Sequence, residues 1–220
     1  MNHSPAALVK NPVSNALDSI GDGIANGKKR MRPAMLHFAK VHRMASEHIG
    51  ELKKWVTELA RAGSEGETVR LNRAVELIAK NFGVRPHEVA ILGFSPDERS
   101  LRFLAPDNLR PIGEIPMSSI SSLAVRTARE RRPDVVNHFS MVPHASVFEG
   151  VRVDEHWPEP IQKIMSAPLL LGSQVVGVLQ ISRKASEAAE AGPDFTAAQL
   201  RELGVICEAL APCVMLWKTV

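Results

Sequence analysis

Two long apolar runs separated by a glycine turn constrain the fold of this chain more than any other feature. Ile164–Leu171 and Val175–Ser182 are rich in aliphatic residues, and Gly172 and Ser173 lie between them. Apolar runs of this length, bounded by turn residues, predict the two antiparallel strands of a hairpin. Glycine and glutamine residues interrupt the combined stretch, so it is too polar and too short to predict a membrane span.

Four shorter strands are predicted upstream of this hairpin. Val89–Phe94 and Leu101–Leu104 flank a polar turn and predict a second hairpin. Ile112–Met117 and Asp134–Asn137 predict two further short strands. Together these patterns predict an α+β fold with a central antiparallel sheet of five to six strands.

Helices are predicted on both sides of these strands. Apolar residues at helical spacing predict a helix over Glu67–Asn81, and Gly83 can provide its left-handed stop. A second helix is expected to begin at Ser118 or Ser119 and to run to Arg132.

A third helix is expected after Thr196, which with Gln199 forms the pattern of a capping box. Its apolar residues repeat at spacings of three and four. We expect this stripe to contribute to a dimer interface through Leu203, Leu210 and Trp217.

The region before the sheet divides into an arm at residues 1–30 and a long helix at residues 31–62, followed by a domain at residues 63–220. Apolar residues in the helix alternate at spacings of three and four, which is typical of a helix that pairs with one partner. The alternative is a helix that folds back onto its own domain. The stripe residues expected at a dimer interface are Phe38, Val41, Ala45, Ile49, Leu52, Val56 and Leu59.

Charge and composition exclude few classes of function. The net charge is +3, and eight Lys or Arg residues against two acidic residues lie between Lys28 and Lys54. A solvated helix face explains this run better than a phosphate-binding surface. With seven Phe, three Trp and no Tyr, a base-stacking surface is hard to build, so nucleic acid is not an expected partner.

The cysteines and the N-terminus indicate a cytoplasmic protein. The chain has two cysteines, Cys207 and Cys213, which are too few for a disulfide framework. The first ten residues lack the pattern of a signal peptide.

Four stretches carry a resemblance to a known family. They are Glu88–Phe94 with Ser100–Leu104, Glu114–Ser118 with Ser122–Val136, Ser166–Ile181, and Pro193–Leu200. In this order they are similar to the GAF family of signalling domains, bacterial type, over roughly residues 65–217. The resemblance implies a sheet with helices on its faces, a pocket roofed by residues 118–161, and outer helices that pair between subunits.

The roof supplies the candidate ligand site. An apolar lining with a few convergent polar groups is typical of small-molecule pockets. The alternative for each of these residues is a place in the core beneath the roof. The candidates are Met117, Ser119, Ser122, Leu123, Asn137, His138, Phe139, Phe148 and Trp157.

More specific ligands find little support in the sequence. Asn137, Phe148 and Asp154-Glu155 echo the pattern of cyclic-nucleotide-binding relatives, but the lysine is missing and the spacing differs. The roof has no cysteine of the kind used by methionine sulfoxide reductase or bilin-binding relatives. Its histidines match no metal-site spacing. The cofactor, if any, stays unidentified.

These observations predict a non-catalytic sensor domain. It would bind an unknown small molecule beside the sheet and transmit the signal through a homodimer to a downstream signalling protein. A first alternative is an interaction module with a vestigial pocket. A second is a redox enzyme acting through Cys207 or Cys213, although no catalytic motif accompanies them.

Overall fold

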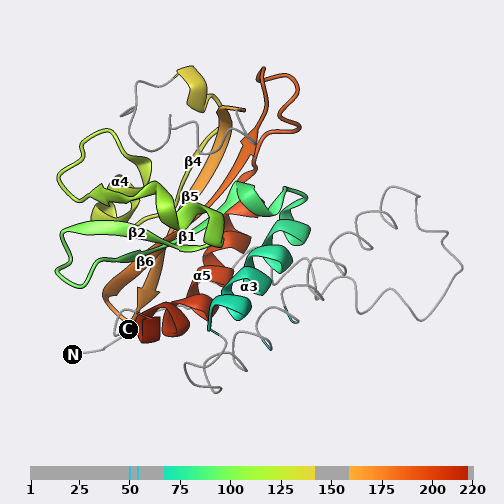
Figure 1. Cartoon of the computed structure of the whole chain (residues 1–220). Coiled ribbons are helices and arrows are strands. Elements are labelled where there is room, and N and C mark those ends of the chain that lie inside the picture. Colours follow the sequence, from blue (N-terminus) through green and yellow to red (C-terminus); the bar gives the residue numbers. More distant parts are fainter. Residues whose placement is uncertain (1–49, 51–53, 55–66, 142–158, 218–220) are drawn as a thin grey trace, which may run out of the picture. The chain divides into compact units, whose positions relative to one another are not determined.

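A six-stranded antiparallel sheet forms the centre of the molecule (Figure 1). The computed structural model describes residues 67–141 and 159–217, with Gly50 and Lys54 as isolated positions. The strand order is β3-β2-β1-β6-β5-β4, and all neighbours are antiparallel. The strands are β1 (Val89–Phe94), β2 (Ser100–Ala105), β3 (Glu114–Pro116), β4 (Asp134–Val136), β5 (Ile161–Leu171) and β6 (Gln174–Lys184).

Helices cover both faces of this sheet, which confirms the predicted α+β class. Helices α3 and α5 lie beside each other on one face, and α4 lies on the opposite face (Figure 1). The α-helices are α3 (Glu67–Phe82), α4 (Leu123–Glu130) and α5 (Ala197–Trp217), and the short 3-10 helices are η1 (Pro86–Glu88), η2 (Asp107–Ile112) and η3 (Phe139–Met141).

Helix α3 forms as the sequence predicts. Leu71, Val75, Ile78 and Phe82 are buried at helical spacing and pack in the main core against the sheet. Gly83 follows with a φ of +62°, the left-handed conformation that glycine adopts without steric cost.

Helix α5 departs from the expected dimer role. Its capping box is present, because Thr196 N donates to Gln199 Oε1 and Gln199 N donates to Thr196 Oγ1. However, Leu203 and Leu210 are both 0% exposed within the core of their own chain. The apolar stripe of α5 therefore faces the sheet, and these two leucines are not available to a second subunit.

Other parts of the predicted dimer interface lie outside the described residues. The arm at residues 1–30 and the stripe from Phe38 to Leu59 belong to that part of the chain. Trp217 ends α5, and its side chain is likewise not described.

Two predicted elements are shorter in the structure. Helix α4 begins after Ser122 rather than Ser118 or Ser119, because the Ser122 side chain accepts a hydrogen bond from Val125 N and caps the helix there. It ends before Arg131, which has a φ of +57°. The strand predicted at Ile112–Met117 is shortened to β3, which begins at Glu114, because η2 extends to Ile112.

The hairpin of β5 and β6 is the longest strand pair, as expected from the two apolar runs. Gly172 at its turn has a φ of +59°. Gly177 pairs with Gly93 of β1, and a Cβ atom at Gly177 would overlap the carbonyl oxygen of Leu92. This glycine therefore permits the close approach of β6 to β1. Within the described residues, no helix has the length and apolar character needed to cross a membrane.

Candidate functional site

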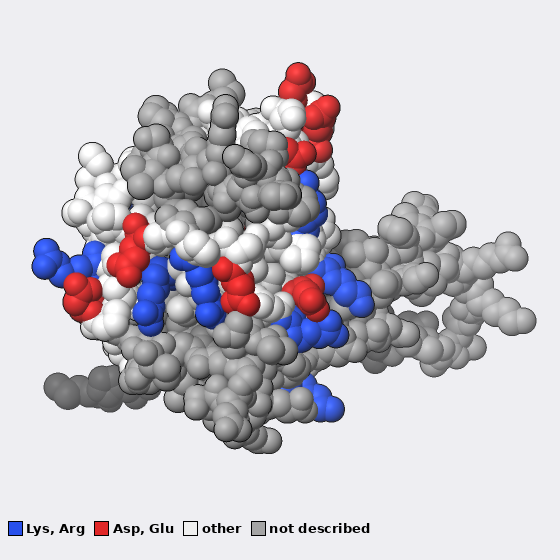
Figure 2. All heavy atoms as spheres, in the orientation of Figure 1, with Lys and Arg blue, Asp and Glu red and all other residues white. Residues whose placement is uncertain are grey.

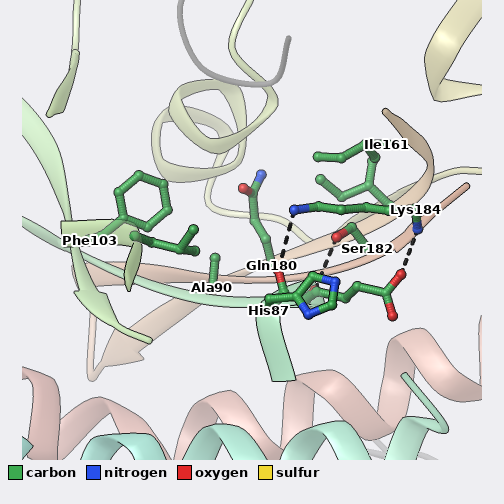
Figure 3. A pocket seen from close by; sticks show the side chains of 10 residues that line it. His87, Ala90, Phe103, Ile161, Gln180, Ser182 and Lys184 are labelled. Atoms are coloured by element: carbon green, nitrogen blue, oxygen red, sulfur yellow. Dashed lines mark hydrogen bonds between the residues drawn. The ribbon is translucent and has the colours of Figure 1, made fainter. Parts of the chain in front are cut away.

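A small hollow lies on the α4 face of the sheet, opposite α3 and α5 (Figure 3). Its volume is about 40 Å³, enough for roughly three water-sized groups. The apolar wall consists of Ala90, Phe103, Leu109, Ile161 and Ile164, and the polar wall consists of His87, Glu88, Gln180, Ser182 and Lys184.

The alternation of β6 positions three of the polar residues. Side chains at every second position of a strand point to the same face. Gln180, Ser182 and Lys184 therefore share the face of the hollow, while Leu179 and Ile181 enter the core under α3 and α5. Because β6 lies between β1 and β5, these groups sit near the middle of the sheet.

Glu88 is the buried charge at one end of the hollow. It is 6% exposed, and its carboxylate accepts hydrogen bonds from Arg85 N at 2.7 Å, Arg85 Nη2 at 3.1 Å and Lys184 N at 2.6 Å. Burial alone would raise the pKa of Glu88, but the hydrogen bonds from Arg85 and Lys184 outweigh it and lower the pKa. Arg85 also pairs with Glu159 at 2.7 Å, so one guanidinium is shared between two carboxylates.

Lys184 is the cation of the hollow. Among the described residues, its Nζ has one hydrogen-bond acceptor, the His87 carbonyl oxygen at 3.3 Å, and no carboxylate ion-pair partner. Burial lowers the pKa of Lys184, and the charge of Glu88 partly opposes that effect. The pKa of His87 is also lowered, first by burial and then by the charges of Arg85 and Lys184, so its ring is mostly neutral at pH 7.

A hydrogen-bonded chain joins the hollow to α4. Thr127 Oγ1 donates to Ser166 Oγ at 2.7 Å, and Gln180 Nε2 donates to the same oxygen at 3.4 Å. All three residues are buried. A movement of the Gln180 side chain would therefore reach α4 through Ser166.

None of the seven described residues among the nine predicted for a ligand site lines this hollow. Leu123 and Phe139 are buried in one cluster with Ile164 and lie behind its wall. Ser122 caps α4, and Met117 packs against the α4-side core.

The other predicted site residues lie elsewhere. Ser119 is half-buried and donates its backbone N–H to Pro116 O, and His138 is exposed. Phe148 and Trp157 lie outside the described residues.

Asn137 links the end of β4 to the start of α5. Its Nδ2 donates to Phe195 O at 3.0 Å, and its Oδ1 accepts from Phe195 N at 2.9 Å. The side chain thus satisfies both backbone groups of Phe195, a residue 58 positions later in the chain. This pair of hydrogen bonds connects the segment after α4 directly to α5.

The sequence analysis missed the polar residues of the hollow. A signal was nevertheless present, because Gln180, Ser182 and Lys184 place polar groups at every second position, with the apolar Leu179 and Ile181 on the alternate positions. Such alternation indicates one face that does not join the apolar core.

The cysteines lie on the other side of the sheet from the hollow. Cys207 and Cys213 are 2% and 1% exposed, within the core formed by α3, α5 and the sheet. Burial raises the pKa of Cys207 and raises that of Cys213 to about 11. Within the described residues, no cluster of three metal-binding side chains occurs.

Basic and acidic side chains are interspersed on the face shown in Figure 2. Arg126 of α4 pairs with Asp134 at 2.6 Å, and Arg132, just beyond the helix, pairs with Glu130 at 2.7 Å. These pairs compensate part of the positive charge of the arginines in and just after α4.

Solved structures of GAF domains match this chain. The GAF domain of a phosphoenolpyruvate-protein phosphotransferase from Coxiella burnetii has a TM-score of 0.57 at 12% identity, over 79% of this chain and 96% of that one. The corresponding domain from Acinetobacter has a TM-score of 0.56 at 14% identity, over 78% and 93%. Free methionine-R-sulfoxide reductase from Neisseria meningitidis, solved with its substrate, has 0.53 at 14%, over 80% and 90%.

No protein-family model and no curated protein matches the sequence. The structural likeness is therefore one of fold, at identities far below those of close relatives. The strand order, the helices on both faces and the coverage of nearly whole GAF domains agree with the expected architecture. The described part of the chain has the fold of a GAF domain.

Proposed function

We propose that this protein is a sensor domain that binds a small molecule in the hollow on the α4 face of the sheet. The observation that carries the proposal is the hollow itself, which combines an apolar lining with polar groups that include a lysine without an ion pair among the described residues. A concave site with an apolar lining and a few polar groups is suited to a small ligand. A methyl-accepting chemotaxis protein is among the structures of similar fold, which favours a signalling role.

Signal transmission would use the connections on either side of the hollow. Ser166 joins Gln180 to α4, and Asn137 joins the segment after α4 to Phe195 at the start of α5. A ligand that shifts α4 therefore has a continuous route of contacts to α5. The apolar stripe at residues 31–62 would hold two subunits together and pass the change to a downstream signalling protein.

Native mass spectrometry of the protein purified from its own host tests the binding proposal. A stoichiometric small molecule, released on denaturation, is the expected result. Purification of an Ala90→Leu variant, which fills part of the hollow from its lining, provides a control for adventitious binding. Protein that is empty, and whose melting temperature no metabolite class raises, would contradict the sensor proposal.

A second candidate function is an interaction module whose hollow has no ligand. The small volume of about 40 Å³ favours it, because pockets for drug-sized ligands measure roughly 300–1,000 Å³. Under this alternative the helix at residues 31–62 would be the working surface. An empty dimer that captures a defined partner through that helix would support it.

A further inference from the structure

Lys184 provides the hollow with an ammonium group, and the negative charges of Glu88 and Glu159 act on it only at a distance. Its ammonium group donates to a backbone carbonyl oxygen, and no carboxylate in the described chain forms an ion pair with it. Withdrawal of an ammonium from water is unfavourable unless an opposite charge or several hydrogen bonds replace the water. An anion in the hollow would satisfy this group.

Gln180 provides a second donor beside it. The residue is 4% exposed, and its only described side-chain hydrogen bond is the long one to Ser166 Oγ at 3.4 Å. Figure 3 shows the side chain of Lys184 extending back along β6 toward Gln180, with both groups on the hollow side of the sheet. The two donors suit the two oxygens of one carboxylate, which accepts charge-assisted hydrogen bonds.

Glu88 limits the charge of the ligand. Its carboxylate is part of the same lining and is already satisfied by Arg85 and by Lys184 N. A dianion such as phosphate would meet one compensating ammonium and a nearby negative charge. A monoanion would meet less repulsion from Glu88 than a dianion would.

The apolar wall and the volume limit the remainder of the ligand. Phe103, Leu109 and Ile164 contribute to the apolar lining of the hollow. A volume of about 40 Å³ has room for roughly three water-sized groups. Together with the carboxylate, an aliphatic chain of one or two carbons would fill this space.

We propose that the hollow binds a short aliphatic monocarboxylate, whose oxygens accept hydrogen bonds from Lys184 Nζ and Gln180 Nε2. This inference rests on the proposed function, since it names the ligand class for the same site. The hollow differs from the ligand site expected from the sequence, because none of its described lining residues is among the nine residues predicted for that site.

Titration of the full chain with acetate, propionate, butyrate, propionamide and inorganic phosphate tests the inference. The readouts are the melting temperature and the NMR shift of the Gln180 side-chain amide. We expect saturable binding of acetate and propionate, and weaker binding of butyrate because its chain exceeds the available space. Propionamide should bind more weakly than propionate by about tenfold or more because it lacks the charge. Inorganic phosphate is expected not to bind.

Variants assign the effect to the two donors. Lys184→Met is expected to weaken propionate binding by about tenfold or more, and Gln180→Leu is expected to weaken it by a smaller factor. Lys80→Met, which removes the same charge from the exposed side of α3, provides the matched control and leaves binding unchanged. The melting temperature without ligand shows that each variant is folded.

The outcomes distinguish this inference from the proposed function. Equal affinity for propionate and propionamide, or an unchanged affinity in folded Lys184→Met, would overturn the carboxylate assignment. Retention of an uncharged host molecule in the hollow would do the same while supporting the sensor role. Failure of every probe, together with empty protein from the host, would overturn both.

Discussion

Glu88 is the residue on which the polar side of the hollow depends. It accepts hydrogen bonds from the backbone of Arg85 and of Lys184, so its carboxylate fixes η1 against the end of β6. Ser182 adds a further bond from its hydroxyl to Glu88 O at 3.1 Å. The buried carboxylate of Glu88 thus helps to hold Lys184 in position through the hydrogen bond from Lys184 N.

We expect Glu88→Gln to lower the free energy of unfolding at pH 7 by about 1–3 kcal/mol, because hydrogen bonds to a charged acceptor are lost. The folded pKa of Glu88 is depressed, so its stabilisation is present above its ordinary value near 4.5 and is lost as the pH falls through the folded value. The variant should therefore lose less stability than the wild type between neutral and acidic pH. Urea unfolding at several pH values measures both effects.

Glu76→Gln is the control for this charge change. Glu76 pairs with Arg73 on the surface, with side chains 55% and 60% exposed, and such pairs contribute about 0–1 kcal/mol. An equal effect of the two substitutions would contradict the role assigned to Glu88.

The two thiols are expected to be inert in the folded protein. Burial raises the pKa of Cys213 to about 11 and also raises that of Cys207, and the thiolate is the reactive form. A thiol reagent at pH 8 should label both cysteines only after unfolding. Rapid labelling of native protein would instead revive the redox alternative.

At the scale of elements, β6 and β1 approach each other so closely at Gly177 that no Cβ atom fits there. Gly177 lies against the Leu92 carbonyl oxygen, and no side chain can occupy this position without moving a strand. The helices on the two faces depend on this pairing, because the core residues of both faces come from these strands.

Gly177→Ala is expected to destabilise the protein by several kcal/mol or to prevent folding, because overpacking against backbone cannot relax easily. Gly204→Ala is the matched control, since a Cβ atom there would meet no described atom within 4 Å. Gly204 lies inside α5, so its replacement should stabilise the protein by up to about 1 kcal/mol. Thermal unfolding measures whether Gly177→Ala lowers the melting temperature and Gly204→Ala raises it.

The elements show which features were predictable from the sequence. Local patterns identified the α3 stop at Gly83, the strand pair around Gly172 and the capping box at Thr196. The start of α4 was misplaced because several serines compete as caps, and the geometry around Ser122 decides among them. These errors concern boundaries rather than the identity of the elements.

The hollow was not predictable in the same way. Phe103, Ile164 and Lys184 come from three strands that are separated in the sequence and meet only in the folded sheet. Periodicity indicates which face a residue occupies but not which residues of other strands it meets. The same limitation explains why Leu203 and Leu210 were predicted at a dimer interface. An apolar stripe on a helix can pack against a sheet of its own chain as well as against a helix of a second subunit.

At the scale of the whole molecule, the oligomeric state depends on a segment outside the described residues. The apolar stripe at residues 31–62 predicts a dimer, whereas the described α5 directs its leucines inward. Any dimer should therefore depend on the N-terminal segment rather than on the core of α5.

Deletion of residues 1–62 is expected to convert a dimer into a monomer, because it removes the complete stripe. Light scattering coupled to gel filtration measures the mass, and carboxylate titration measures whether the hollow is retained. Leu52→Asp within the full chain, which places a charge in the stripe, should have the same effect on mass. A truncated protein that stays dimeric would place the interface elsewhere.

The hydrogen bonds between Asn137 and Phe195 have a consequence for hydrogen exchange. The amide of Phe195 is protected by a side chain from a distant part of the sequence rather than by a strand or a helix turn. Its exchange with deuterium therefore reports the opening of this one link, separately from the unfolding of α5. A ligand that slows or accelerates exchange at this single amide would show, in a protein of unchanged global stability, that the site communicates with the terminal helix.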